Sequence, residues 1–289
     1  MCFYRDRLSK AATVRTILLP LMIVVLSSFN LSAPSDLNPF INDFLSRFGA
    51  FPQGPPNDPM FDQQWNLERI RADRVWHLTQ GEGIVVAVVD TGIDYTHEDL
   101  SQNIWVNAGE DLNGNGLADE EDYNGVDDDG NGFVDDLIGW NFADQNNDPR
   151  DTNGHGTRVS GIIAAAGNNE TGIIGVAPRA RIMPLKILGD QRGGSEDEFA
   201  AAYDYAIEMG AHIIHNSLTA AAFNTINPVL ENAVRRAVNA GVMVVFTVSN
   251  QGDKVKFYSP QNMLETVTVG QADFLDVPNH HLARKSGCG

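Results

Sequence analysis

The sequence is poor in cysteine, in basic side chains and in long apolar runs, and each shortage excludes a class of protein. Its two cysteines, Cys2 and Cys288, lie at opposite ends of the 289 residues, so a disulfide framework is not expected. Lysine and arginine together number 20 against 38 acidic residues, and the net charge of −18 argues against a nucleic-acid partner. The one long apolar run, residues 17–26, is shorter than the ~20 residues that span a bilayer.

This apolar run has the flanks of a secretory signal peptide. It is preceded by four basic side chains, Arg5, Arg7, Lys10 and Arg15. Residues 31–33, Leu-Ser-Ala, follow it and offer small residues for cleavage. We therefore predict a cleaved leader at residues 1–33 and a secreted protein that keeps no stable membrane anchor. An uncleaved anchor is the alternative.

The remaining sequence divides into a short polar segment and one large domain. Residues 34–60 are rich in Pro, Asn, Asp and Gly, which predicts a linker or the remnant of a propeptide. Residues 61–289 are long enough, in a chain with 43% apolar residues, to bury the core of one α/β domain. We expect this domain to be monomeric.

Strand-like runs alternate with helix-like segments along this domain, which predicts a mostly parallel sheet with helices on both faces. Strands are predicted at residues 84–89, 181–188, 212–217, 242–248 and 266–270. Ser195 and Glu198 form a capping box that opens a helix to Met209, and Pro228 begins another helix. The apolar pattern at residues 65–76 fits a short amphipathic helix.

Most of the negative charge lies in one segment, because residues 110–151 hold 14 acidic side chains and one arginine. Within it, an insertion at residues 110–136 contains two partial copies of a calcium loop. The first copy has oxygen-bearing residues at loop positions 1, 3, 5, 9 and 12, which are Asp111, Asn113, Asn115, Asp119 and Asp122. The second copy has them at positions 1, 3, 5 and 9, which are Asp127, Asp129, Asn131 and Asp135.

Position 12 of the second copy is Ile138, so its bidentate carboxylate is missing unless another acidic residue fills in. Hard oxygen ligands around a turn-forming glycine still predict Ca²⁺ in at least one copy; a solvated acidic loop is the alternative. No amphipathic helix flanks either copy, which indicates an inserted loop stiffened by metal and not a calcium sensor.

Three polar residues lie where a site would need them. Asp90 ends the strand at 84–89, Asn250 follows the strand at 242–248, and His155 begins a helix between two glycines. The carboxyl ends of parallel strands are where α/β sheets place their sites. Each residue also has a purely structural interpretation, as a cap, a packed histidine or a turn.

Together with their neighbours, these residues resemble the subtilisin family of serine endopeptidases. Val88–Asp94 resembles the aspartate motif of the family, and His97–Leu100 follows it at the family's spacing. Asn153–Thr157 resembles the histidine motif, Gly175–Pro178 the segment after the histidine helix, and Ser249–Gly252 the oxyanion asparagine motif. The resemblance extends from about residue 56 to the end of the sequence.

The resemblance implies a three-layer α/β fold and acyl transfer by an Asp-His-Ser triad. Asp90 would orient His155 and stabilise its imidazolium, and His155 would act as general base and then general acid. Asn250 would donate its side-chain amide to the oxyanion.

The resemblance also assigns binding residues. Ser217, Leu218 and Thr219 match the extended segment that pairs with the backbone of protein or peptide substrates. Asp99 matches a calcium ligand of the family, with residues 168–173 as the rest of that site. Thr219 replaces the usual glycine, and His215 and Arg158 also depart from the common residues, so substrate preference is left open.

The largest departure is the nucleophile. The family's Gly-Thr-Ser-Met-Ala motif does not occur, and Ser217, Ser249, Ser259 and Ser286 lack its context. Residues 282–289 resemble a segment that precedes this motif in the family. We therefore expect a chain that stops before its serine, lacks the C-terminal elements of the fold and is inactive as given. The alternative is a non-catalytic calcium- or peptide-binding protein on a protease scaffold.

Overall fold

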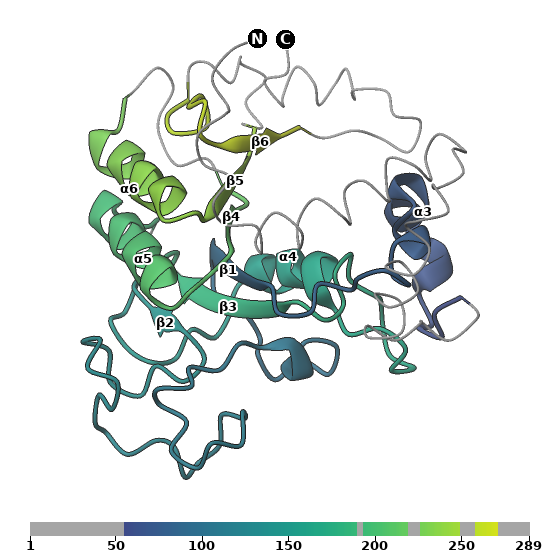
Figure 1. The fold of residues 1–289 in the computed structure, drawn as a ribbon, viewed down its shortest axis with the longest axis horizontal. Helices are drawn as coiled ribbons and strands as arrows, with labels where there is room; N and C mark the ends of the chain where they lie inside the picture. The colour runs from purple at the N-terminus through teal and green to yellow at the C-terminus, as the bar shows by residue number, and fades with distance from the viewer. Residues whose placement is uncertain (1–54, 190–192, 219–225, 249–257, 271–289) are drawn as a thin grey trace, which may run out of the picture. The chain divides into compact units, whose positions relative to one another are not determined.

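The computed structural model describes residues 55–189, 193–218, 226–248 and 258–270 (Figure 1). Two compact units are distinguished within these ranges. Ile70–Gln80 belong to a small unit, and the larger unit comprises Pro56–Arg69 and the chain from Gly81 onward. No helix in the described ranges is long and apolar enough to cross a membrane.

The larger unit is built on a six-stranded sheet with the order β2-β3-β1-β4-β5-β6, in which all neighbouring strands are parallel. The strands are β1 (Val85–Asp90), β2 (Trp140–Asn141), β3 (Arg181–Lys186), β4 (Ile213–Asn216), β5 (Met243–Thr247) and β6 (Val267–Val269). The mostly parallel sheet predicted from the sequence is confirmed. Strand β2 was not predicted, because two residues are too few to show any periodicity.

The helices are α3 (Trp65–Ile70), α4 (His155–Ala164), α5 (Glu196–Glu208) and α6 (Pro228–Asn239), with short 3-10 turns at Phe61–Gln63, Ala72–Arg74 and Ser101–Asn103. The predicted capping box is present at the start of α5. Glu198 N donates to Ser195 Oγ at 3.2 Å, and Ser195 N donates to Glu198 Oε2 at 2.8 Å. Pro228 occupies the first turn of α6, where a missing N–H group costs nothing.

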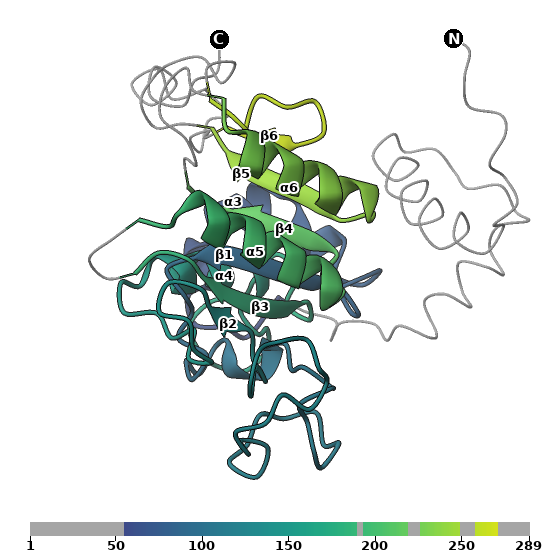
Figure 2. The same cartoon turned by 90° about the vertical axis from the view of Figure 1, so that its left-hand side faces the viewer.

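The helices cover both faces of the sheet, as the side chains of β1 show. Ala87 and Val89 pack into a core that includes residues of α5 and α6, whereas Val86 and Val88 pack into a second core that includes Ala164 of α4. Successive strand side chains point to opposite faces, so these two cores lie on either side of the sheet. Figures 1 and 2 show the same three layers, with α5 and α6 on one face and α4 on the other.

The amphipathic helix predicted at residues 65–76 is shorter than expected. Helix α3 ends at Ile70, whose side chain is 58% exposed, and Arg71 then adopts a left-handed conformation with φ of 57°. A left-handed residue cannot continue an α-helix. This end could not be predicted from the sequence, because a left-handed conformation is expected of glycine and not of arginine.

Candidate active site

Asp90 and His155 are in direct contact. Asp90 is the last residue of β1 and is fully buried, and His155 is the first residue of α4. The distance between His155 Nδ1 and Asp90 Oδ1 is 2.7 Å. An ionised carboxylate only accepts hydrogen bonds, so the proton of a neutral imidazole lies on Nδ1 and Nε2 is an acceptor. The His155 side chain is 45% exposed, which leaves it accessible to a reacting molecule.

Glycines next to both residues allow the end of β1 and the start of α4 to approach. A Cβ atom on Gly156 would overlap the carbonyl oxygen of Gly92 and lie 3.2 Å from Asp90 Cβ. Gly92 has a φ of +94°, which favours glycine, and a Cβ there would overlap the carbonyl oxygen of Pro149. Both glycines are therefore required by close packing around the Asp90–His155 contact.

Asp151 joins the two segments that carry this contact. Its Oδ1 atom accepts hydrogen bonds from Thr91 Oγ1 at 2.9 Å and from the backbone N–H groups of Asn153 and Gly154. Its Oδ2 atom accepts from Thr157 Oγ1 at 2.6 Å and from Thr157 N at 3.0 Å. Burial raises the pKa of Asp151, but the bonds from Thr157 and the backbone outweigh burial and hold the pKa below its ordinary value.

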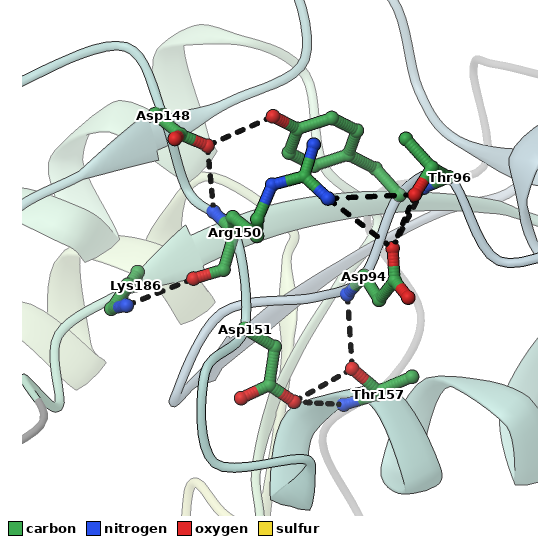
Figure 3. A network of polar contacts seen from close by, with 8 residues as sticks. Asp94, Thr96, Asp148, Arg150, Asp151, Thr157 and Lys186 are labelled. Atoms are coloured by element: carbon green, nitrogen blue, oxygen red, sulfur yellow. Dashed lines mark hydrogen bonds and ion pairs between the residues drawn. The ribbon is translucent and has the colours of Figure 1, made fainter.

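A second layer of contacts holds the segment around Arg150 against the chain that follows β1 (Figure 3). The guanidinium of Arg150 lies 4.5 Å from the centre of the Tyr95 ring, and its Nη1 atom is 3.7 Å from Asp94 Oδ1. The Tyr95 hydroxyl donates to Asp148 Oδ1 at 2.9 Å. Lys186, the last residue of β3, donates to the Arg150 carbonyl oxygen at 2.8 Å.

The predicted substrate segment leaves the sheet at the same edge as Asp90. Ser217 and Leu218 follow β4 directly, and β4 pairs in parallel with β1. His215 of β4 is paired with Val88, and burial lowers its pKa although the Asp90 charge opposes this effect. Two other predicted residues, Thr219 and Asn250, lie outside the described residues.

Asp99, the predicted calcium ligand, contacts the segment 168–173 that was predicted to complete its site. Its Oδ1 atom accepts a hydrogen bond from Asn169 Nδ2 at 2.8 Å, and its Oδ2 atom accepts from Ile173 N at 2.9 Å. Asp58, which was assigned to the linker, accepts from Asn168 N at 3.0 Å and is 4% exposed. This contact of Asp58 could not be predicted, since a single aspartate in a Pro- and Asn-rich segment carries no signal of it.

The first acidic loop gathers its five predicted residues around one turn. Asp111 accepts hydrogen bonds from three backbone N–H groups of the turn. The side-chain amides of Asn113 and Asn115 donate to Asp119 Oδ2 at 3.2 and 2.9 Å. Asp122 is fully buried and accepts from two further backbone N–H groups of the loop.

The second acidic loop brings together three of its four predicted residues. Asp127 accepts from three backbone N–H groups of its turn, and Asn131 Nδ2 donates to Asp129 Oδ2 at 3.2 Å. Asp135 instead accepts from the backbone N–H groups of residues 124 and 125, at 2.9 and 3.0 Å. Asp135, the fourth predicted ligand, therefore stabilises the turn that precedes the loop.

Glu110, which was not among the predicted ligands, lies beside this second loop. One carboxylate oxygen from each of Glu110, Asp127 and Asp129 lies within 4.8 Å of the others. Burial raises the pKa of Glu110, against the lowering effect of the backbone N–H groups of residues 128 and 129. The only signal in the sequence was the missing carboxylate at position 12.

Comparisons with known proteins agree on one family. A model of the subtilase family, Peptidase_S8, matches residues 81–286. Subtilisin-like protease 1 of Plasmodium berghei (strain Anka) is 34% identical over 197 residues, which are 67% of this chain and 31% of the relative. Thermitase of Thermoactinomyces vulgaris is 31% identical over 219 residues, which are 75% of this chain and 66% of the relative. The chain thus spans less than a third of the length of the Plasmodium relative.

A solved structure described as proteases from Pseudoalteromonas arctica PAMC 21717 is also similar. Its TM-score is 0.59 at 26% sequence identity, and the match covers 79% of this chain and 69% of the other.

We expect Asp151→Asn to lower the free energy of unfolding by about 2 kcal/mol at pH 7, because the neutral amide accepts more weakly from Thr157 and the backbone. The pKa of Asp151 is depressed in the folded protein, so the stabilisation is present above the ordinary pKa of about 3.9 and is lost as the pH falls below it. Urea unfolding of both proteins at pH 7 and pH 3 measures this. The exposed Asp62→Asn is the control; a difference that is the same at both pH values contradicts the prediction.

Proposed function

This chain belongs to the subtilase family of serine proteases, and from that premise we propose that it takes part in the hydrolysis of peptide bonds in protein or peptide substrates. The observation that carries the proposal is the 2.7 Å contact between His155 Nδ1 and the buried Asp90 carboxylate. A buried aspartate that fixes the tautomer of a half-exposed imidazole is the acid–base part of a serine protease triad.

In this proposal His155 moves the proton and Asp90 makes that movement favourable. With Nδ1–H bound to Asp90, the Nε2 atom takes the proton of the attacking hydroxyl and passes it to the leaving amine. The imidazolium that forms is stabilised by the carboxylate, which the Thr91 N–H group holds in place at 2.7 Å. Asn250, assigned by resemblance, donates to the oxyanion.

Substrate binding is proposed for the chain after β4. Ser217 and Leu218 continue from a strand that is hydrogen-bonded to β1, so a peptide paired with them would run past the edge of the sheet where Asp90 lies. Backbone pairing of this kind binds peptides of many sequences equally well, and side-chain pockets determine which peptide sequences are preferred. Thr219 in place of a glycine adds a Cβ atom to that segment.

For a polypeptide of residues 1–289 alone, we propose that no hydrolysis takes place. The sequence contains no Gly-Thr-Ser-Met-Ala stretch, so none of its serines has the family's context for a nucleophile. This observation favours a second candidate function for that polypeptide, the binding of peptides or calcium without cleavage.

We also propose secretion, because residues 1–33 have the charge and apolar pattern of a cleaved leader. N-terminal sequencing of the exported protein should then begin after Ala33. An exported protein that retains Cys2 would contradict this proposal.

Calcium is the proposed cofactor, at Asp99 and in the acidic loops. The buried Asp99 carboxylate and the aspartate and asparagine oxygens of the loops are the ligands that Ca²⁺ prefers. Near Asp99, the buried Oδ1 atom of Asp58 has no hydrogen-bond partner among the described residues, which fits a cation at this place. The ion would neutralise these carboxylates and stabilise the folded chain.

His155→Ala tests the proposed mechanism when it is introduced into the whole protein that contains these residues. We expect a loss of kcat on a fluorogenic peptide, and in subtilisin itself the corresponding loss is roughly 10⁶-fold. His77→Ala, at an exposed position, is the matched control and should leave kcat unchanged. Hydrolysis that survives His155→Ala would overturn the mechanism. In a polypeptide of residues 1–289, a fluorophosphonate probe should label no serine.

Asp99→Asn tests the proposed calcium site. Free calcium at ~100 times its dissociation constant should add about 2.7 kcal/mol to the free energy of unfolding for each such site. Thermal unfolding with excess calcium and with EDTA should therefore differ less in Asp99→Asn than in the unchanged protein. Asp62→Asn serves as the charge-matched control. A melting temperature that EDTA does not change would rule out calcium binding.

A further inference from the structure

Glu110 is a fully buried carboxylate with one oxygen that no protein group satisfies. Its Oε1 atom accepts hydrogen bonds from Asp128 N at 2.8 Å and Asp129 N at 3.3 Å. Its Oε2 atom is buried and has no hydrogen-bond partner among the described residues. A buried charged oxygen without a protein partner is costly, and a bound water or cation would satisfy it.

The surroundings of Glu110 add negative charge. Oxygens of Glu110, Asp127 and Asp129 lie within 4.8 Å of one another, and this is the one group of three or more acidic, histidine or cysteine side chains in the described ranges that could hold a metal. Asp127 is half-buried and Asp129 is exposed, so water screens part of the repulsion between these carboxylates and Glu110, and a cation between the three would remove the rest.

No lysine or arginine of the insertion supplies a positive charge to these three carboxylates. The only lysine or arginine between residues 110 and 151 is Arg150, and it is engaged with Asp94 and the Tyr95 ring. No ion pair joins Glu110 to a basic residue within the part of the chain that the structure describes. A bound cation would supply this charge.

We propose that Glu110 supplies the carboxylate that the second acidic loop lacks at position 12, and that its Oε2 atom binds a Ca²⁺ ion together with Asp127 and Asp129. The ligand comes from 17 residues before the loop and not from its end, where Ile138 stands. This inference rests on the proposed calcium binding by the loop and is independent of peptidase activity.

The spacing of the oxygens suits calcium. Two oxygens bound to one Ca²⁺ ion can lie up to about 5 Å apart, because each Ca–O distance is about 2.3–2.6 Å. The carboxylate oxygens of Glu110, Asp127 and Asp129 lie within 4.8 Å of one another and so meet this condition.

The surrounding residues hold the group in position. A Cβ atom on Gly109 would lie 2.5 Å from Asp129 Cβ, so only glycine allows Glu110 and Asp129 to approach this closely. Asn107 Nδ2 donates to Asp129 Oδ2 and to Asp136 Oδ1, both at 2.9 Å. Asp136 is fully buried and accepts from the hydroxyl of Tyr205 in α5 at 2.5 Å. The site is thereby connected to the core of the domain.

Calcium titration of the full 289-residue chain, freed of metal with EDTA and followed by calorimetry, tests the proposal. In Glu110→Gln, one class of calcium site should weaken by at least the ~10–100-fold that loss of an outer-shell partner costs, while the other sites stay unchanged. Glu120→Gln removes the same charge from an exposed position of the insertion and should leave all sites unchanged. Equal isotherms for the unchanged protein and Glu110→Gln would overturn the inference.

The stability of the same variant separates a ligand from a purely structural residue. Glutamine keeps an oxygen that accepts from the N–H groups of Asp128 and Asp129, and it removes the unpaired buried charge. In EDTA, Glu110→Gln should therefore be at least as stable as the unchanged protein, whereas in excess calcium it should melt at a lower temperature. Equal destabilisation under both conditions would overturn the proposal. Neither readout involves hydrolysis, so each result stands apart from the outcome of His155→Ala.

Discussion

The hydrogen bond between the buried Asp90 carboxylate and His155 is the interaction on which the site depends. A charge at the end of the central strand is tolerated only if hydrogen bonds replace its lost water. Thr91 N and His155 Nδ1 provide two such bonds, both to Oδ1 at 2.7 Å, whereas the buried Oδ2 atom has no partner among the described residues. The start of α4 must then touch the end of β1, and Gly92 and Gly156 make that contact sterically possible. The histidine is thus positioned by the requirements of the carboxylate behind it.

Much of this fold was predictable because its signals are local. The apolar run of β1, the capping box at Ser195 and the proline at the start of α6 each act within a few residues, and the structure has all of them. The end of α3 and strand β2 were not predictable. Arg71 adopts a left-handed conformation that is expected of glycine and not of arginine, and β2 consists of only two residues.

The candidate site likewise contains some residues that could be predicted from the sequence and others that could not. Asp90 and His155 could be predicted from short motifs, since close packing requires glycines beside them. The roles of Asp151, Asp58 and Glu110 could not be predicted, because each depends on contacts between segments that are far apart in the sequence or on a set of bonds to several backbone amides. Asp58 contacts a residue 110 positions away, and no local pattern encodes that distance.

The contacts of Glu110 also decide where this sequence can change length. The chain leaves the domain at Glu110 and returns at Asp128 and Asp129, whose backbone amides bind the same carboxylate. The residues between these points form a loop whose two ends are held together by the Glu110 carboxylate. The length of this loop therefore has little effect on the sheet. Each doubling of such a loop costs only about 0.6 kcal/mol in closure entropy. Residues added between 112 and 126 would therefore have little effect on the sheet, but they would disturb the proposed calcium ligands Asn113, Asn115, Asp119 and Asp122.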